Sequence, residues 1–352
     1  MTLETHRGDA RIADLPQRFE DNAALEAFLS RPSQPLIDDL AAVPGDILVL
    51  GAGGKMGPTL ARLARNAAPQ KRILAVARFT EPGLQEGLES CGIETITCDL
   101  LDRAAVERLP RVANVIFMAG RKFGASQNTA LTWAMNVHMP AIVAETFRTS
   151  RIVCFSTGNV YPLMPLPRGG AAEATPPAPV GEYAQSCLGR ERIFEHFSTE
   201  YGTPGRLFRL NYAIETRYGV LHDIAARVWA GTQVDVTMGH VNVIWQGDAN
   251  AQALRCLRHC TTPTSPINIS GPEIVAVRWI AEEFGHRMDR KPLIAGEEAP
   301  SALLTNAAQA AGLFGYPGVP LTRMLDWVAD WIMRDQPSLN KPTKYEVLDG
   351  VF

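Results

Sequence analysis

Short apolar runs alternate with amphipathic helical stretches along the first two thirds of the chain. Residues 46–50 read Asp-Ile-Leu-Val-Leu, a continuous apolar run between two glycines, which is the pattern of a strand buried on both faces. Similar runs recur, and a helical stretch follows each of them, so the pattern indicates a doubly wound parallel α/β sheet. The predicted strands are residues 46–50, 72–77, 94–97, 114–118, 151–155 and 206–210, and the predicted helices are 58–66, 84–90, 103–109, 130–149 and 183–201.

The pattern changes after residue 211, where helical stretches dominate and the apolar runs become shorter. Helices are predicted at 218–230, 246–259, 277–284, 306–313 and 321–333, with short strands at 234–237 and 266–269. Such a segment forms a smaller α/β lobe over the carboxyl ends of the sheet, where ligands bind in these folds. We therefore divide the chain into an N-terminal helical extension (1–44), a sheet domain (45–212) and a substrate-binding lobe (213–352). The extension is expected to contain helices at 23–29 and 35–42. Some segments of the lobe are expected to return to the sheet, and its polar end (337–352) to form an extended arm.

Composition and charge exclude several classes of partner. The 352 residues carry a net charge of −3 without an acidic or basic tail, which argues against nucleic acid as the main partner. The N-terminus lacks the apolar core of a signal peptide, and no apolar run is long enough to span a bilayer. Six cysteines without a disulfide-like spacing indicate a reduced, cytoplasmic protein. Cys256, His259 and Cys260 lie close together but lack a second pair of ligands, so no metal site is expected.

A glycine-rich turn joins the first predicted strand to the helix that follows it. Gly51, Gly54 and Gly57 permit a tight turn, a close approach of the backbone to a pyrophosphate, and close packing of the helix on the strand. The helix N-terminus adds unpaired N–H groups and a positive dipole end for the phosphates. The turn in this context predicts a Rossmann-type dinucleotide-binding domain. The residues expected to contact the cofactor are Gly51, Gly54, Lys55, Met56, Gly57, Arg78, Asp99, Leu100, Met118, Ala119 and Gly120.

The end of the second strand bears on the choice of cofactor. Proteins that bind NAD place Asp or Glu there to hold the ribose hydroxyl groups, whereas this chain has Arg78. Arg78 and Lys55 of the turn would both suit a 2′-phosphate, which favours NADP over NAD. The alternative is that Arg78 only points to solvent. Asp99, after the third strand, is expected to meet the adenine.

The ordered motifs between about residues 46 and 331 resemble the extended short-chain dehydrogenase/reductase family, in its NAD-dependent epimerase/dehydratase branch. Beside the glycine turn, the matching segments are Cys98-Asp-Leu-Leu-Asp102, Phe155-Ser-Thr-Gly-Asn-Val-Tyr161, Tyr183 at the start of a helix, Arg209-Leu-Asn-Tyr212, Gln246-Gly-Asp248 and Asn268-Ile-Ser-Gly271. The resemblance implies hydride exchange with the nicotinamide, with Thr157 holding the substrate oxygen and Tyr183 exchanging the proton. It also implies a homodimer formed by the helices at 130–149 and 183–201.

One position departs from the family pattern. The family's lysine, which lowers the pKa of the tyrosine, belongs four residues after Tyr183, and Cys187 stands there. Three interpretations remain open. The protein is a weak or inactive enzyme, or a cation from the loop after the fourth strand (Arg121 or Lys122) replaces the lysine, or Cys187 has a role of its own. A small buried residue is the simplest interpretation of Cys187.

Two further departures bear on the reaction and the substrate. Nucleotide-sugar dehydratases of the family carry Asp-Glu after the active threonine, whereas this chain has Gly158-Asn159, which leaves epimerisation or simple oxidoreduction. The segment 238–245 is short and lacks the arginine that clasps a nucleotide diphosphate, so we expect a smaller sugar or sugar-acid substrate. The alternative function is a catalytically weak NAD(P)-binding sensor or partner subunit. The expected substrate contacts are Arg121, Lys122, Asn211 and Arg217.

Overall fold

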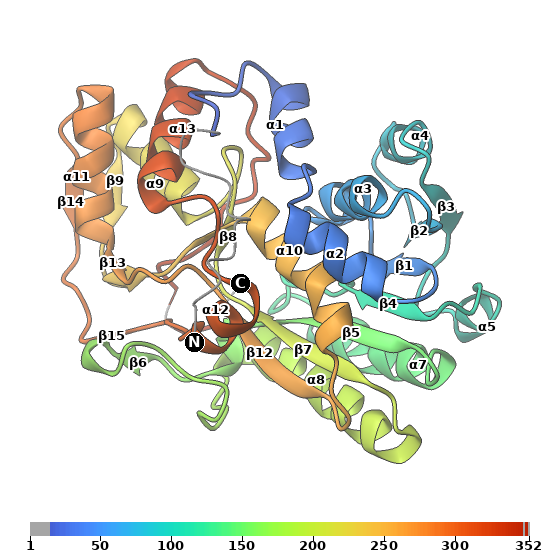
Figure 1. The fold of residues 1–352 in the computed structure, drawn as a ribbon. Helices are drawn as coiled ribbons and strands as arrows, with labels where there is room; N and C mark the ends of the chain where they lie inside the picture. Colours follow the sequence, from blue (N-terminus) through green and yellow to red (C-terminus); the bar gives the residue numbers. More distant parts are fainter. Residues whose placement is uncertain (1–14, 348, 351–352) are drawn as a thin grey trace, which may run out of the picture.

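A seven-stranded parallel sheet forms the centre of the computed structural model, which describes residues 15–347 and 349–350. The strand order is β12-β7-β5-β4-β1-β2-β3, and every neighbouring pair is parallel. This doubly wound Rossmann arrangement confirms the fold that the alternating pattern predicts (Figure 1). The strands are β1 (Ile47–Leu50), β2 (Ile73–Ala77), β3 (Glu94–Thr97), β4 (Asn114–Phe117), β5 (Arg151–Thr157), β7 (Gly205–Leu210) and β12 (Ser265–Ile269).

Helices cover both faces of the sheet, because alternate residues of the strands point to opposite faces. On one face, Ile47 and Val49 pack in a core with α2, α3 and α10. On the other face, Leu48 and Leu50 pack in a core with α5, α7 and α8. The covering helices are α2 (Gln34–Ala42), α3 (Gly57–Ala67) and α10 (Gln246–Arg255) on the first face and α5 (Arg103–Glu107), α7 (Met139–Thr146) and α8 (Gly181–Tyr201) on the second, with α4 (Leu84–Glu89) beside β3.

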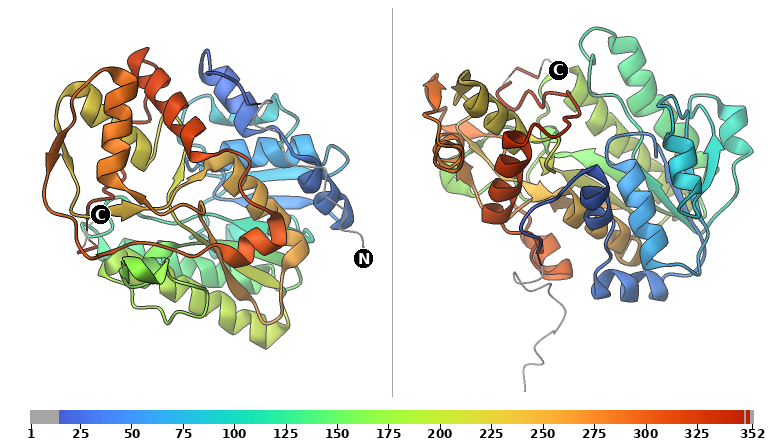
Figure 2. Two further views of the ribbon diagram at one scale, coloured as in Figure 1. Left: turned by 60° about the vertical axis from the view of Figure 1, so that its left-hand side comes forward. Right: turned by 90° about the horizontal axis from the view of Figure 1, so that it is seen from above.

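A further hydrophobic core holds the lobe together and includes part of the N-terminal extension. Trp245 and Trp327 are buried there, and Phe19 and Phe28 form aromatic pairs with both of them. Helix α1 therefore packs on the lobe, while α2 packs against α10 and α3 on one side of the sheet (Figures 1 and 2). The lobe elements are α1 (Asn22–Leu29), α9 (Val220–Ala230), α11 (Val277–Met288), α13 (Leu321–Met333) and the strand pairs β9 (Gln233–Asp235) with β14 (Leu293–Ala295) and β10 (His240–Val241) with β13 (Val275–Ala276).

Some segments differ from the predicted elements. The helix predicted at 130–149 is interrupted by a π turn, because Pro140 has no N–H to continue the regular ladder. The helix predicted at 246–259 ends at Arg255 and continues as a single 3-10 turn. The helix predicted at 306–313 is α12 (Ala308–Phe314), and the predicted helix at 130–149 contains α6 (Thr129–Trp133) and the π turn (Ala134–His138) before α7. Four two-residue strands are too short to leave a periodic pattern: β6 (Met164–Pro165), β8 (Ala213–Ile214), β11 (Ile244–Trp245) and β15 (Ser301–Ala302).

A buried ion pair joins three elements beneath the carboxyl edge of the sheet. Arg209 of β7 and Glu191 of α8 are 3% and 0% exposed, and two hydrogen bonds of 2.9 and 2.6 Å connect them. Ser156 of β5 donates to the same carboxylate, and Arg209 donates to the hydroxyl of Tyr161. Both charges are therefore compensated by close partners, which is the condition for a buried ion pair to be tolerated.

The ion pair leads to a test of stability. Replacing Arg209 by Met leaves the Glu191 carboxylate buried without its counter-charge, so we expect the free energy of unfolding to fall by about 3–5 kcal/mol. Urea unfolding followed by circular dichroism measures this change. The control is Arg192→Met in the exposed pair with Glu195, for which a loss of about 0–1 kcal/mol is expected. Equal losses in the two variants would contradict the role given to the buried pair.

Candidate active site

The glycine turn is held tightly against the end of β4. Gly51 has φ +92°, and a Cβ atom there would lie 2.6 Å from the backbone nitrogen of Ala119. A Cβ atom on Gly57 would lie 2.4 Å from the carbonyl oxygen of Ala52, so only glycine lets α3 begin so close to the turn. At Gly54, by contrast, a Cβ atom would meet only the Gly51 carbonyl oxygen, at 3.5 Å. The turn therefore has the close contacts and the open side that a dinucleotide pyrophosphate requires.

Two cavities meet at this turn, on the carboxyl edge of the sheet. The first, here called the Arg78 cavity, measures about 320 Å³ and lies over the ends of β1 to β4. The second, here called the Tyr183 cavity, measures about 260 Å³ and lies over the ends of β1, β5 and β7. Of the predicted residues, the Arg78 cavity contains Gly51, Gly54, Arg78, Asp99, Leu100, Met118, Ala119, Gly120 and Arg121, and the Tyr183 cavity contains Gly51, Gly54, Lys55, Met56, Met118, Lys122, Thr157, Tyr183 and Asn211.

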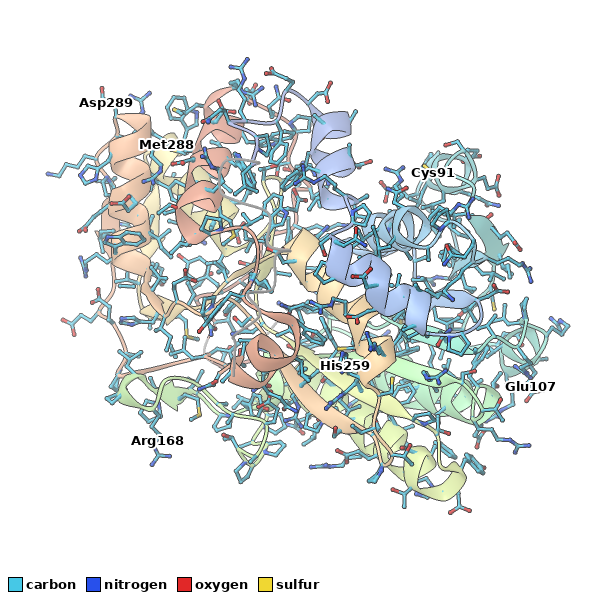
Figure 3. The ribbon with its side chains drawn as sticks, viewed as in Figure 1. Cys91, Glu107, Arg168, His259, Met288 and Asp289 are labelled. Carbon is cyan, nitrogen blue, oxygen red and sulfur yellow. The ribbon has the colours of Figure 1, made fainter. Side chains whose placement is uncertain are left out.

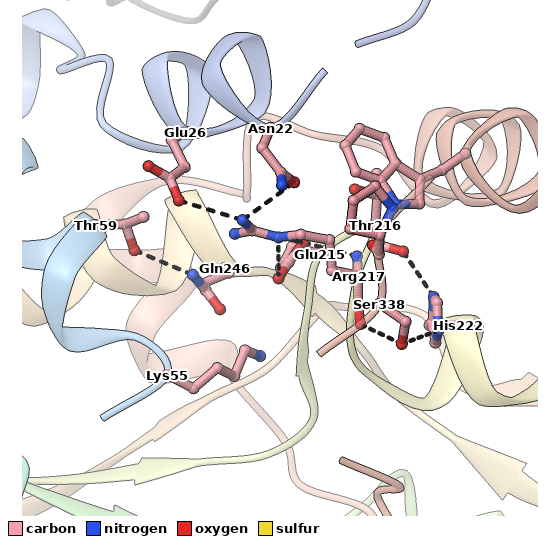
Figure 4. A network of polar contacts seen from close by, with 12 residues as sticks. Asn22, Glu26, Lys55, Thr59, Glu215, Thr216, Arg217, His222, Gln246 and Ser338 are labelled. Carbon is pink, nitrogen blue, oxygen red and sulfur yellow. Dashed lines mark hydrogen bonds and ion pairs between the residues drawn. The ribbon is translucent and has the colours of Figure 1, made fainter. Parts of the chain in front are cut away.

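Lys55 lies in the Tyr183 cavity, not beside Arg78. Its ammonium group donates to the carbonyl oxygen of Ala213 at 3.3 Å and lies 3.8 Å from the ring centroid of Tyr218. Burial lowers the pKa of Lys55 to about 7, with the charge of Glu215 acting against this shift. Figure 4 shows the side chain directed towards the lobe. The prediction that Lys55 and Arg78 share one 2′-phosphate is therefore wrong, because the turn directs Lys55 away from the Arg78 cavity.

Two other predicted substrate contacts also lie elsewhere. Arg217 forms ion pairs with Glu215 at 3.1 Å and with Glu26 of α1 at 3.2 Å, and it lines neither cavity (Figure 4). Arg121 lines the Arg78 cavity and donates to the carbonyl oxygen of Gly124 at 3.2 Å. Arg217 is held by its near neighbour Glu215 and by Glu26 from the distant helix α1, whereas the Arg121 side chain bonds within its own loop.

Thr157 and Tyr183 come together on the wall of the Tyr183 cavity. Thr157 ends β5, Tyr183 lies in the first turn of α8, and the two side chains are hydrogen-bonded. Burial, followed by the neighbouring Cys187, raises the pKa of Tyr183 well above its ordinary value. Because its pKa is raised, the phenol of Tyr183 is protonated at neutral pH and available as a proton donor. Asn211 lines the same cavity, and its amide donates to the side chain of Asn242 at 2.8 Å.

Cys187 is a buried thiol in the position of the family's lysine. It is 1% exposed, packs among apolar residues, and burial raises its pKa. Two cations oppose this shift, first Arg190 and then Lys122. The ammonium group of Lys122 lies 5.9 Å from the ring centroid of Tyr183, and burial lowers the pKa of Lys122 to about 8. Lys122, one of the two predicted replacement cations, thus lies in the cavity, whereas Arg121 does not line it.

Arg190 is a cation that the sequence interpretation missed. It lies seven residues after Tyr183 on α8 and donates to the Phe155 carbonyl oxygen at 2.9 Å and to the Asn136 side chain at 2.7 Å. Its charge lowers the pKa values of both Tyr183 and Cys187. A Cβ atom on Gly120 would lie 2.3 Å from its guanidinium, so the glycine makes room for this cation. Helical spacing from Tyr183 was the signal that could have identified it.

Two searches of the described residues concern metal ligands and membrane-spanning helices. Within residues 15–347 and 349–350, no group of three or more His, Cys, Asp or Glu side chains is arranged to hold a metal ion. His259 lies near the amino-terminal ends of β7 and β12 (Figure 3), away from the cavities, and its carbonyl oxygen accepts a hydrogen bond from Arg206 at 2.6 Å. In the same part of the chain, no helix is both long and apolar enough to cross a membrane.

Comparisons with known proteins place this geometry in a family. The fold resembles that of UDP-glucuronic acid 4-epimerase from Bacillus cereus in complex with UDP-glucuronic acid and NAD, with 16% sequence identity and a TM-score of 0.69 over 82% of this chain and 99% of that chain. It also resembles UDP-glucose 4-epimerase from Thermus thermophilus in complex with NAD, with 18% identity and a TM-score of 0.67 over 81% of this chain and 98% of that chain. A third similar structure is MoeE5 in complex with UDP-glucuronic acid and NAD, with 18% identity and a TM-score of 0.68 over 82% of this chain and 99% of that chain. No curated protein sequence matches the chain. The model of the NAD dependent epimerase/dehydratase family matches residues 47–239, more than half of the chain. The chain therefore belongs to the NAD-dependent epimerase/dehydratase family, as its motifs predict.

Proposed function

We propose that this protein is an NAD(P)-dependent oxidoreductase or epimerase that acts on a small carbohydrate-like substrate. The hydrogen-bonded pair of Thr157 and Tyr183, on the wall of a cavity that begins at the glycine turn, is the observation that carries the proposal. The family match and the NAD named with the similar structures support it. The homodimer expected through the helices at 130–149 and 183–201 remains a prediction.

The residues of the two cavities fit the two halves of a dinucleotide. Gly54 faces both cavities and would let the pyrophosphate approach the turn, close to the N-terminus of α3. Arg78 and Asp99 would hold the adenosine half in the Arg78 cavity. The nicotinamide half would enter the Tyr183 cavity, where the bound cofactor supplies or accepts a hydride.

Tyr183 and Thr157 would handle the substrate oxygen. The raised pKa keeps the phenol of Tyr183 protonated, so it is ready to donate a proton to a carbonyl oxygen that is being reduced. In the opposite direction the phenol must first lose its proton, and the charge of Arg190 makes this loss easier. The hydroxyl of Thr157, held by hydrogen bonds with Asn159, would fix the orientation of the substrate oxygen. The site is therefore better suited to proton donation near neutral pH than to proton removal.

The dimensions of the Tyr183 cavity favour a small substrate. Its volume of about 260 Å³ is below the roughly 300–1,000 Å³ found for ligand pockets, and it must also accept the nicotinamide. The C-terminal segment adds Thr343 to the wall, which narrows the space on the lobe side. These features support a free sugar or sugar acid rather than the nucleotide sugars named with the similar structures.

Tyr183→Phe tests the proposed chemistry. The change removes the hydroxyl and keeps the ring, so we expect kcat on the true substrate to fall by about 10²-fold or more while cofactor affinity is retained. Steady-state kinetics and NADH fluorescence titration measure the two quantities. Tyr201→Phe, at the exposed end of the same helix, is the matched control. Full activity of Tyr183→Phe would contradict the mechanism.

The preference for NADP rests on Arg78 alone, since Lys55 lies in the other cavity. If Arg78 pairs with the 2′-phosphate, Arg78→Ala weakens NADPH binding by about tenfold and leaves NADH binding almost unchanged, because only NADPH carries that charge. Fluorescence titration with both reduced cofactors measures the difference. Equal effects on NADPH and NADH would exclude a specific role for Arg78.

The second candidate function is a cofactor-binding protein with little catalysis, and Cys187 is the observation that favours it. Cys187→Lys restores the family's lysine in a buried place that already faces Arg190, so we expect a lower Tm and no gain in turnover. Cys187→Ala is the control for the thiol itself. Thermal denaturation and steady-state kinetics of both variants separate the two functions, because a gain of turnover with lysine would identify a decayed enzyme.

A further inference from the structure

Residues 338–347, here called the C-terminal strap, lie along the lobe and reach the Tyr183 cavity. Near the start of the strap, the backbone N–H of Leu339 donates to the carbonyl oxygen of Arg217 at 3.2 Å. Near its end, Tyr345 is 1% exposed in the core of the lobe, and its hydroxyl donates to the carbonyl oxygen of Asp235 at 3.0 Å. The strap is therefore fixed to the lobe at both ends. Two side-chain contacts add to this attachment, namely Ser338 with His222 at 3.0 Å (Figure 4) and Glu346 with Arg227 at 2.7 Å.

Thr343, in the middle of the strap, lies on the wall of the Tyr183 cavity and is 4% exposed. Its backbone N–H donates to a carboxylate oxygen of Asp223, on α9, at 2.7 Å, and its hydroxyl donates to the same oxygen. Its carbonyl oxygen accepts a hydrogen bond from Lys122 of the sheet domain at 3.5 Å. One carboxylate of the lobe thus fixes both the backbone and the side chain of the strap at the point where the strap meets the cavity.

Beyond the strap, the chain meets the start of α8, the helix that carries Tyr183. A Cβ atom on Gly181 would lie 2.4 Å from the carbonyl oxygen of Gly350, and one on Gly350 would lie 2.3 Å from the carbonyl oxygen of Val180. The two backbones are therefore in direct contact just before Tyr183. A cavity of only about 40 Å³ separates the strap from the sheet domain, and residues of both line it. This part of the chain thus joins the lobe to the sheet domain beside the Tyr183 cavity.

We infer that the C-terminal strap closes the lobe side of the Tyr183 cavity and sets the size of the substrate that the cavity admits. In this arrangement Thr343 is a specificity-determining residue, and Asp223 is a positioning residue that acts through it. The inference rests on the proposed function for the identity of this cavity as the place of the nicotinamide and the substrate. It goes beyond that function because it assigns the size limit to one segment and to one anchoring carboxylate.

The strap is the wall of the cavity that can yield most easily. The opposite walls are formed by the ends of β1, β5 and β7 of the central sheet, and the glycine turn is packed against Ala119. Residues 338–347, by contrast, form no helix or strand. Segments without a regular backbone ladder open at a lower free energy than core strands. Loss of the Asp223 contacts is therefore expected to widen the cavity on the lobe side and to leave the sheet intact.

Hydrogen exchange measured by mass spectrometry tests whether the strap closes on the site. The full-length protein is measured alone, with NADPH or NADH, and with the matching fragment that lacks nicotinamide, 2′-phospho-ADP-ribose or ADP-ribose. Because the nicotinamide would enter the cavity beside Thr343, we expect the intact cofactor to slow exchange in residues 338–347 by at least about threefold relative to the fragment. Equal exchange with the bound cofactor and the bound fragment would overturn the inference.

Substitutions at position 343 test the anchor. Thr343→Val keeps the shape of the side chain but cannot donate to Asp223, so we expect exchange in the strap to become at least about tenfold faster. Asp223→Ala removes both hydrogen bonds and should have a larger effect, whereas Thr343→Ser retains the hydroxyl and should exchange like the wild type. The matched control is Thr199→Val on α8, which loses a hydroxyl bond to a backbone carbonyl oxygen away from the strap. Wild-type exchange in both Thr343→Val and Asp223→Ala would remove the role given to Asp223.

Calorimetry with the cofactor bound measures the size limit itself. D-glucose and UDP-glucose carry the same hexose and differ in the nucleotide, so we expect the wild type to bind D-glucose at least about tenfold more tightly. Thr343→Val and Asp223→Ala should reduce this ratio by about threefold or more, while Thr343→Ser and Thr199→Val should keep it. A wild type that prefers UDP-glucose, or a ratio that neither anchor variant changes, would overturn the inference. If the wild type binds neither sugar, the exchange measurement with the cofactor decides.

The two proposals fail in different ways. Loss of the proposed function would appear as a wild type that binds no cofactor, or as full activity of Tyr183→Phe, and neither result depends on the strap. The strap loses its role if the protein binds the cofactor and needs Tyr183, yet exchange in residues 338–347 ignores the nicotinamide and the anchor variants select sugars like the wild type.

Discussion

The chain leaves the neighbouring strands β1 and β4 towards opposite faces of the sheet, and the site depends on this arrangement. The two strands are neighbours in the sheet, yet the helix after β1 packs on one face and α7, which follows β4, packs on the other. A crevice therefore opens between their carboxyl ends, where ligands bind in folds of this type. Gly51 can contact Ala119 in this crevice only because it has no side chain. Both cavities begin at this contact.

The crevice also decides the electrostatics of the site. Lys55 and Lys122 line the Tyr183 cavity, and desolvation is the largest cause of the lowered pKa of each. The same effect raises the pKa values of Tyr183 and Cys187. Burial thus favours the neutral forms of all four groups.

Two sets of contacts outside the cavities hold the elements of the site in place. They are the ion pair of Arg209 with Glu191 and the aromatic contacts of the N-terminal extension. The ion pair connects β7 with α8, the helix that carries Tyr183, and Ser156 links it to β5 beside Thr157. Phe19 and Phe28 pack on Trp245 and Trp327 in the lobe. The lobe and the sheet are therefore fixed by contacts that lie outside the cavities.

The sequence by itself determined the sheet and the turn, because both are encoded locally. Continuous apolar runs identify buried strands, glycines at 51, 54 and 57 identify the turn, and the family motifs predict the roles of Thr157 and Tyr183. Only the tertiary structure decided the directions of the cationic side chains. Lys55 turns towards the lobe, Arg217 towards α1, and Arg190 under Gly120. A long, flexible side chain takes its direction from partners that lie far away in sequence, and no local pattern records where the fold will place them.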